Sequence, residues 1–412
     1  MREPPPDVSD GDVLSAVWDR WTPEVDGVEH LPVGFGAHHS CLHGGSAMTL
    51  LDPALTTLTP RLELHVPTAL TRFRQLRAAL PSTAVHYAVK ANPHPVLLRA
   101  LVAAGSSFDV ASPAEVRACL DAGARAADLV YSNPIKLRAD IVSAAELGVR
   151  LFVVDSPEET RKVAEAAPGT AVLCRIVTSG SGSDWPLSRK YGCSTSEAVE
   201  VLRLAAGLGL DPAGVSFHVG SQQRDPSAWD APIEASSRVF AALCQAGLRP
   251  WLLDLGGGFP AALEGGAPAL DAYGAAIRRS LRKRFGSRRP RTLIEPGRSI
   301  VADSGRLVTS VVAVVHRGDT RWVYLDAGVF TGLVETLDEA IRYRLETDVA
   351  GPTCDSADVL YEKQPVHLPL TLAEGDRVVL TSAGAYTTCY STVGFNGFAP
   401  LPTELVLGLV PA

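Results

Sequence analysis

Short apolar runs alternate with longer amphipathic stretches through most of the chain, beginning near Val85. Each run ends in a polar or small residue, whereas the stretches between them are rich in Ala, Leu and Arg, as in 113–122 and 158–166. Short apolar runs of this kind predict buried parallel strands, and the stretches between them predict helices. The eight predicted strands are 85–89, 107–110, 129–131, 151–154, 172–176, 215–218, 251–255 and 292–294.

Eight strands, each followed by a helix or a long connection, predict a parallel (β/α)8 barrel over residues 85–300. Doubly wound sheets usually have fewer strands, so the count favours the barrel. After about Val301 the pattern changes to β-rich runs separated by turns, at 306–316, 321–325 and 377–381. These runs predict a second, mostly antiparallel β domain over residues 301–412.

The chain before the barrel divides into two predicted parts. Residues 46–84 are expected to contribute a lead-in strand and a helix. Residues 1–45 are rich in Pro, Asp and Gly and are predicted to be an N-terminal extension whose role the sequence leaves open. The cluster His38-His39-Ser40-Cys41-Leu42-His43 lacks the separated ligand pairs of a zinc site, so a polar loop and no metal are expected.

Composition narrows the class of protein. Of the 412 residues, 46% are hydrophobic and 20% are charged, so the chain can bury a large core. A formal net charge of −7 argues against nucleic acid or an anionic membrane as the main partner. No apolar run is long enough to span a bilayer, and the N-terminus does not resemble a signal peptide. Seven scattered cysteines without paired spacing predict reduced thiols and a cytosolic protein.

Functional side chains recur at the ends of the predicted strands. Barrel enzymes place their chemistry at the carboxyl ends of the strands, so these side chains are expected to form one polar ring. In chain order the ring contains Lys90, Asp109, Asn133, Arg175, His218, Gly256-Gly257-Gly258 and Glu295.

Lys90 is the first candidate for chemistry, because it ends the apolar run 85–89. Burial lowers the preference of an amine for its charged form, and a neutral amine attacks an aldehyde. A lysine at a strand end is more often a surface residue with its ammonium group in water. The other members of the ring favour the Schiff-base lysine of a pyridoxal phosphate enzyme.

Two glycine-containing turns predict a phosphate site. Gly256-Gly257-Gly258 follows one predicted strand and lets backbone N–H groups approach an anion, although a lone triple glycine is more often a flexible turn. Arg298, in the turn after the next strand, offers a guanidinium to the same anion. Glu295 in that turn is suited to keep a pyridine nitrogen protonated. His218 is either a ring-stacking group or a hydrogen-bonded barrel histidine.

The β-rich region adds further candidates. Cys354 and Asp355 stand side by side in a predicted loop, where a thiol can deliver a proton and a carboxylate can hold a cation. The alternative is an unreactive cysteine in a turn. Tyr386 offers a phenol, and Phe395 offers an aromatic wall.

In combination these motifs resemble the fold-type III pyridoxal phosphate decarboxylases of the ornithine/lysine/diaminopimelate group, nearest the bacterial ornithine/lysine branch. The resemblance covers roughly residues 60–400 and implies an alanine racemase-like barrel followed by a β domain. The motifs that carry it are 87–92, 108–115, 216–223, 254–260, 295–299, 351–358 and 384–398.

The resemblance implies a role for each matching residue. Lys90 forms the Schiff base with the cofactor, His218 stacks on its ring, and Glu295 pairs with its pyridine nitrogen. The phosphate is held by Ser221, Gly257, Gly258, Arg298 and Tyr386. The cofactor pocket is lined by Asp109, Glu115 and Arg175. The substrate is contacted by Asp355, Asp326 and Phe395.

The resemblance also implies a head-to-tail homodimer in which Cys354 and Asp355 enter the site of the partner subunit. Eukaryotic ornithine decarboxylases have an aspartate where this chain has Ala327, with Asp326 one residue earlier. We therefore expect space at Ala327 and a weakened preference for ornithine. The expected activity is decarboxylation of L-ornithine or L-lysine to a diamine, as in polyamine biosynthesis.

Three alternatives stay open at this point. The substrate could be diaminopimelate, arginine or an amino acid of specialised metabolism. A racemase shares the barrel and the lysine, but alanine-type racemases place an arginine against the pyridine nitrogen, where this chain has Glu295. A non-catalytic regulatory homologue is disfavoured, because such proteins tend to lose cofactor residues, whereas Lys90, Glu295, Arg298 and Cys354 are present.

Overall fold

A closed parallel barrel forms the larger part of the protein. The computed structural model describes residues 58–406, with gaps at 188–189, 319, 344–348, 353, 355, 362 and 365–367. The strands hydrogen-bond in the order β10-β11-β2-β3-β4-β5-β6-β8, and β8 pairs with β10 to close the barrel. All eight predicted strands are confirmed: β2 (Thr83–Ala88), β3 (Ser107–Val110), β4 (Leu129–Tyr131), β5 (Leu151–Val154), β6 (Ala171–Arg175), β8 (Asp211–Ser216), β10 (Leu252–Asp254) and β11 (Arg291–Ile294).

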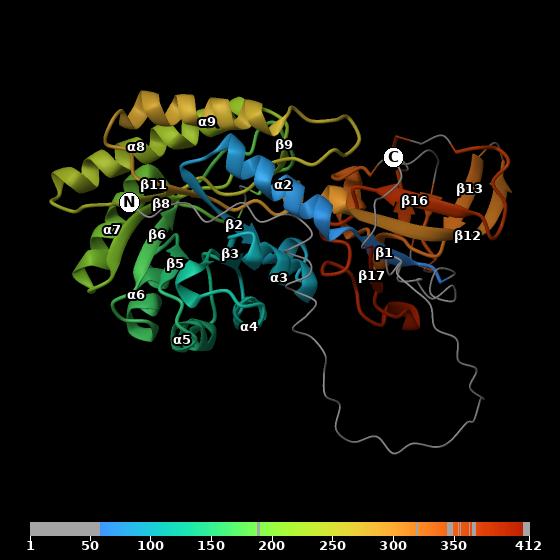
Figure 1. The fold of residues 1–412 in the computed structure, drawn as a ribbon, viewed down its shortest axis with the longest axis horizontal. Coiled ribbons are helices and arrows are strands. Elements are labelled where there is room, and N and C mark those ends of the chain that lie inside the picture. The colour runs from blue at the N-terminus through green and yellow to red at the C-terminus, as the bar shows by residue number, and fades with distance from the viewer. Residues whose placement is uncertain are drawn as a thin grey trace, which may run out of the picture. The chain divides into compact units, whose positions relative to one another are not determined.

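Helices connect the strands along the outside of the barrel (Figure 1). Two of them begin with the pattern Ser-Pro-x-Glu, and the reason is local: Ser112 and Ser156 accept hydrogen bonds from the backbone N–H groups of Glu115 and Glu159. Proline at the first helical position suits both starts. The helices are α2 (Val66–Ala79), α3 (Pro95–Ala103), α4 (Pro113–Asp121), α5 (Arg138–Glu146), α6 (Pro157–Ala166), α7 (Thr195–Gly207), α8 (Asp230–Gln245), α9 (Leu270–Phe285) and the short α10 (Arg298–Val301).

The inside of the barrel is filled by small and branched side chains. A separate buried cluster takes one residue from each of six strands, and it contains Val130, Val153, Leu173, Ala213, Leu252 and Leu293. A barrel of eight strands is narrow enough for such side chains to fill it. Polar chemistry is therefore confined to the strand ends.

The second sheet confirms the predicted β domain but draws on both ends of the described chain. Its order is β15-β14-β13-β12-β1-β17, and β16 also pairs with β12. These strands are β12 (Gly305–Arg317), β13 (Thr320–Leu325), β14 (Val349–Ala350), β15 (Val359–Leu360), β16 (Arg377–Thr381), β17 (Thr403–Leu405) and the early strand β1 (Arg61–Leu64).

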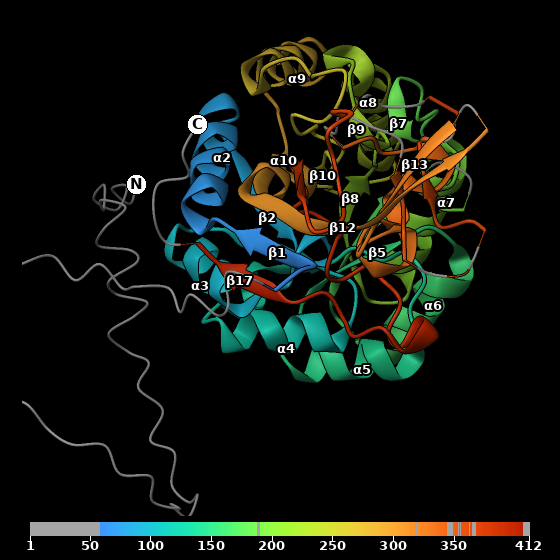
Figure 2. The same ribbon diagram turned by 90° about the vertical axis from the view of Figure 1, so that its right-hand side faces the viewer.

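The lead-in strand β1 therefore belongs to the C-terminal sheet, where it lies between β12 and β17 (Figure 2). Leu62 and Leu64 are fully buried, while Arg61 pairs with Glu63 at 2.7 Å and with Glu404 at 2.9 Å. The charges in this segment are thus compensated across the sheet. A division of the chain at residue 301 does not separate the two sheets cleanly. Among the described residues, no helix combines the length and apolarity needed to cross a membrane.

Candidate active site

A cavity of about 480 Å³ lies at the carboxyl ends of the barrel strands. Five members of the predicted polar ring line it, each from a separate strand end: Lys90, Asn133, Arg175, His218 and Glu295. The other lining residues are Ala111, Ser132, Pro134, Pro186, Leu187, Lys190, Tyr191, Ser221 and Tyr386. The last two are predicted phosphate-binding residues, so the cavity joins the proposed lysine to the proposed phosphate site.

Lys90 lies in a single 3-10 turn, η2 (Val89–Ala91), directly after β2. Its Nζ is 3.1 Å from Oδ2 of Asp109, which is buried on the neighbouring strand β3. The negative charge of Asp109 raises the pKa of Lys90, and this effect exceeds the opposing effect of burial. The expectation that burial alone would favour a neutral amine is therefore wrong. Asp109 instead offers a carboxylate that can take up the proton of the amine.

Glu295 is buried beside a second carboxyl group. Its Oε1 accepts a hydrogen bond from the hydroxyl of Ser132 at the end of β4. Burial, and then repulsion from Asp254, raises the pKa of Glu295 well above its usual value. Burial also raises the pKa of Asp254 to about 7. A buried carboxyl group that holds its proton near neutral pH is well suited to share that proton with a pyridine nitrogen.

His218 is held as a neutral ring. Its Nδ1 accepts a hydrogen bond of 3.0 Å from the backbone N–H of Gly220. Burial, and then the positive charge of Arg175, lowers the pKa of His218 well below its usual value. A neutral imidazole can lie against an aromatic ring without the desolvation cost of a buried cation.

The glycine turn after β10 has no room for side chains. A Cβ at Gly257 would lie 2.6 Å from the carbonyl oxygen of Glu295 and 3.0 Å from Nε2 of His218. Gly256 and Gly258 have φ of 65° and 103°, a region that side chains disfavour. This turn therefore presents bare backbone beside His218 and Glu295, which line the cavity. Bare backbone is what an anion cradle needs.

Arg298, a predicted phosphate ligand, is not among the residues that line the cavity. Its guanidinium is buried and donates two hydrogen bonds of 2.7 Å to the two carboxylate oxygens of Glu335. A third hydrogen bond of 3.1 Å reaches the hydroxyl of Ser221, and the guanidinium lies over the ring of Tyr386 at 4.9 Å. Arg298 thus stands behind two residues that line the cavity. Glu335, which sequence reasoning missed, neutralises it.

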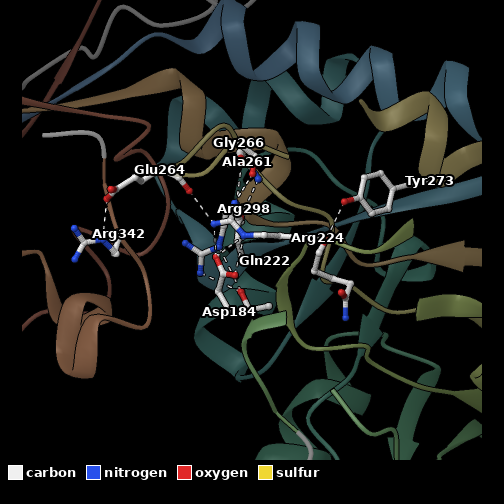
Figure 3. Close-up of polar contacts among 11 residues, drawn as sticks. Asp184, Gln222, Arg224, Ala261, Glu264, Gly266, Tyr273, Arg298 and Arg342 are labelled. Atoms are coloured by element: carbon white, nitrogen blue, oxygen red, sulfur yellow. Dashed lines mark hydrogen bonds and ion pairs between the residues drawn. The ribbon is translucent and has the colours of Figure 1, made fainter. Parts of the chain in front are cut away.

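A polar network fixes the strand that carries Ser221, β9 (Ser221–Gln223), and Figure 3 shows how it is built. The amide of Gln222 makes two hydrogen bonds to the backbone of Ala261, of 2.9 and 3.0 Å. Arg224 pairs with Asp184 at 2.6 Å, and the hydroxyl of Tyr273 donates to the carbonyl of Gln223 at 2.8 Å. Strand β9 is therefore tied to β7 (Ser183–Trp185), to the loop after the glycine turn and to α9.

A buried lysine that the sequence analysis passed over supports the opposite wall. The side chain of Lys136 is fully inaccessible, and Nζ donates to the carbonyls of Asn133 at 2.9 Å and Val153 at 2.6 Å. It also lies 3.1 Å from Oε1 of Glu159, whose other oxygen pairs with Lys162. Burial lowers the pKa of Lys136 to about 8. This ion cluster holds the loop that carries Ser132 and Asn133.

Two predicted residues lie elsewhere. Glu115 does not line the cavity; its carboxylate accepts a hydrogen bond of 2.7 Å from the backbone N–H of Ala111, which does. Asp326 accepts a hydrogen bond of 2.9 Å from the backbone N–H of Ser310 and lies outside the cavity of its own chain. Ala327 is fully buried in its own chain.

Cys354 and Phe395 also lie outside the cavity of their own chain. The thiol of Cys354 is exposed and accepts a hydrogen bond of 3.4 Å from the amide of Asn396, and Phe395 packs on Phe330 with ring centroids 4.9 Å apart. The two predicted residues thus form one group on the β domain. Asp355, the third predicted member, lies outside the described residues.

Comparisons with known proteins show which family the chain belongs to. The family profile "Pyridoxal-dependent decarboxylase, pyridoxal binding domain" matches residues 68–302. The chain is 34% identical to the lysine/ornithine decarboxylase of Selenomonas ruminantium over 84% of this chain and 89% of that protein. It is 31% identical to antizyme inhibitor 2 of Xenopus laevis over 80% of this chain and 77% of that protein.

A comparison with a solved structure points to the same family. The lysine/ornithine decarboxylase of Vibrio vulnificus, complexed with putrescine, superposes with a TM-score of 0.77 at 33% identity, covering 84% of this chain and 94% of that one. The chain belongs to the pyridoxal-dependent decarboxylases. Its cofactor is pyridoxal phosphate.

The residues present fit that cofactor. Lys90 supplies an amine, the bare glycine turn supplies backbone beside His218 and Glu295, and Ser221 with Tyr386 supplies hydroxyl donors in the same cavity. Oδ1 of Asp109 is buried without a hydrogen-bond partner among the described residues, which is unusual for a carboxylate. In the same part of the chain, no group of three or more His, Cys, Asp or Glu side chains is placed to hold a metal.

We predict that Gly257→Ala lowers the affinity for pyridoxal phosphate at least tenfold, roughly 1.4 kcal/mol. The added methyl group would displace the carbonyl of Glu295 or the ring of His218. Absorbance titration of the cofactor measures the affinity. The control is Gly207→Ala at the end of α7, where the structure leaves open space. Equal cofactor affinity in the two variants would contradict the proposed cradle.

We also predict that Lys136→Met lowers the free energy of unfolding by about 3–5 kcal/mol, because it breaks a buried ion pair without replacing the charge. Denaturant unfolding measures the change. The control is Arg138→Met, since Arg138 pairs with Glu165 at 2.7 Å where both side chains are exposed, and such pairs contribute about 0–1 kcal/mol. A loss for Lys136→Met no greater than for the control would refute the supporting role.

Proposed function

We propose that the protein decarboxylates a basic L-amino acid, L-lysine or L-ornithine, to a diamine and carbon dioxide. The observation that carries this proposal is one cavity lined by Lys90, His218 and Glu295, in which Lys90 is paired with the buried carboxylate of Asp109. The similarity to two lysine/ornithine decarboxylases supports the substrate class. The pathway that this activity would serve is polyamine biosynthesis.

Each residue of the cavity has a defined task in this proposal. Lys90 would hold the cofactor through its amine, and Asp109 would take up the proton that the amine must lose. When bound, pyridoxal phosphate supplies an aromatic ring that withdraws the electron pair left by the departing carbon dioxide. Glu295 would hold a proton at the pyridine nitrogen, with Ser132 fixing the orientation of its carboxyl group.

The remaining groups would bind and orient. The neutral ring of His218 would lie against the cofactor ring. Ser221, Tyr386 and the backbone of Gly257 and Gly258 would hold the phosphate, with Arg298 acting through Ser221. The Arg298–Glu335 pair anchors this wall to η7 (Val334–Glu339), which follows β13.

The proton donor is proposed to come from a second copy of the chain. Cys354 and Phe395 lie outside the cavity of their own chain, and both are at least partly exposed. A head-to-tail homodimer would bring Cys354 to the site of the other subunit, where its thiol would protonate the substrate carbon. Asp355 beside it would pair with the distal ammonium of the substrate.

Two other activities fit less well. A racemase needs an electron sink weaker than a protonated pyridine, and a carboxylate at Glu295 paired with the pyridine nitrogen would favour the protonated ring. The second is a non-catalytic regulatory protein, since one relative is named antizyme inhibitor 2. Lys90 is paired with Asp109, and the charge of Arg298 is neutralised by Glu335. Both observations favour catalysis. The six cysteines in the described part are free thiols, which supports a cytosolic enzyme.

Lys90→Ala should abolish carbon dioxide release from L-lysine and L-ornithine, because no other amine is paired with Asp109. Lys283→Ala, an exposed change on α9, should retain normal activity. A substrate panel with carbon dioxide release as the readout tests the class. Turnover of meso-diaminopimelate, with neither L-lysine nor L-ornithine accepted, would overturn the proposed substrate. Binding of the cofactor without turnover of any amino acid would favour the regulatory alternative.

A mixture of Lys90→Ala and Cys354→Ala proteins should regain activity that each lacks alone. After subunit exchange, half of the dimers would be hybrids with one intact site of two, so about a quarter of normal activity is expected. Exchange is verified by native mass spectrometry with differently tagged chains. Verified hybrids without activity would place both residues in the site of one chain.

A further inference from the structure

A second cavity, of about 450 Å³, lies at the opposite end of the barrel from Lys90. Trp251 directly precedes β10 and Arg291 begins β11, so the cavity adjoins the amino ends of these strands. Helices α8 and α9, side by side in Figure 1, and the segments that directly follow them contribute the rest. The lining residues are Ser237, Phe240, Ala241, Cys244, Pro250, Trp251, Arg284, Phe285, Arg288, Arg289, Pro290 and Arg291.

The charge at this cavity is concentrated in one segment. Residues 278–291 contain eight Lys and Arg residues and no Asp or Glu, in a chain of formal net charge −7. Arg282, Lys283 and Arg284 occupy the last turn of α9, where cations offset the helix dipole. Arg288 and Arg289 lie beyond the end of the helix, so the dipole does not account for them.

The arginines at the cavity differ in how they are compensated. Arg284 pairs with Glu234 at 2.5 Å, and the guanidinium of Arg291 lies 5.8 Å from the ring centre of Trp251. Arg288 and Arg289 are exposed and make no ion pair or hydrogen bond through their side chains within the described residues. Two guanidinium groups are thus available for an anion at the mouth of the cavity.

The inner surface is aromatic. Phe240 and Phe285 meet edge to face, with ring centroids 5.4 Å apart. Trp251 keeps 37% of its surface exposed, and its indole N–H donates to Oδ2 of Asp211 at 3.0 Å, which fixes the plane of the ring. Fixed aromatic walls of this kind suit a flat ring, as arginines suit phosphate groups.

We propose that this cavity binds a small anion that joins a flat heteroaromatic ring to two or more phosphate groups, of the nucleoside di- or triphosphate class. A volume of about 450 Å³ suits one such molecule. A nucleic acid strand would instead need a basic track across several nucleotides. The site is separate from the cavity at Lys90, so the proposal does not depend on the catalytic assignment.

Isothermal titration of the full-length, cofactor-saturated protein with ATP tests the proposal. The double variant Arg288→Ser/Arg289→Ser should weaken ATP binding at least tenfold, because it removes both unpaired guanidinium groups. The matched control is Arg279→Ser/Arg282→Ser, which removes the same charge from exposed positions of α9 outside the cavity. That control should change the affinity less than twofold. Trp251→Leu should weaken binding of ATP and leave binding of inorganic tripolyphosphate unchanged.

Several results would overturn the proposal. Absence of ATP binding, or equal weakening by the two double variants, would show that the cavity does not select the ligand. Tripolyphosphate binding as tightly as ATP would show that the aromatic wall has no role. A single-stranded oligonucleotide that binds more tightly than ATP would assign the surface to nucleic acid. Loss of the cofactor absorbance during the ATP titration would place the nucleotide in the cavity at Lys90 instead.

Discussion

The compensation of buried charge is the constraint on which this site depends. A closed parallel barrel brings the carboxyl ends of its strands to one place, and the polar side chains that follow them are forced together in a poorly hydrated region. In the described part of the chain, three cations in and around the site each lie beside an opposite charge. Asp109 compensates Lys90, Glu335 compensates Arg298, and Glu159 compensates Lys136.

These pairs also decide what each group can do. Arg298 makes its two shortest hydrogen bonds to Glu335 and contacts the lining of the cavity through Ser221 and Tyr386. The pair of carboxyl groups at Glu295 and Asp254 has no such compensation and shows raised pKa values instead. A protonated pyridine would fit beside these two buried carboxyl groups.

Local patterns carried most of the fold and part of the site. The apolar runs predicted all eight barrel strands, because strands that are buried on both faces consist of nearly continuous apolar residues. The strand-end rule placed Lys90, His218 and Glu295 in one cavity. The sequence did not predict that β1 belongs to the C-terminal sheet, since its pairing with β12 joins segments more than 200 residues apart.

The partners in long-range ion pairs could not be predicted from the sequence either. Nothing near Glu335 or Lys136 in the sequence marks them as buried, because an ion pair across the fold has no periodicity. The pKa of Lys90 was misjudged for the same reason: burial is a local inference, whereas the effect of Asp109 depends on the neighbouring strand. Asp326 was chosen for its position in a motif, and one oxygen of its carboxylate accepts a hydrogen bond from the backbone N–H of Ser310.

The most direct measurement traps the cofactor on the protein with borohydride and locates the modified lysine by peptide mass spectrometry. Three lysines lie in or beside the cavity: Lys90, Lys136 and Lys190. The account predicts that the added mass falls on Lys90 alone, since only this amine lies in the cavity beside a carboxylate that can take its proton. Modification of Lys190 or Lys136, with Lys90 unmodified, would contradict it.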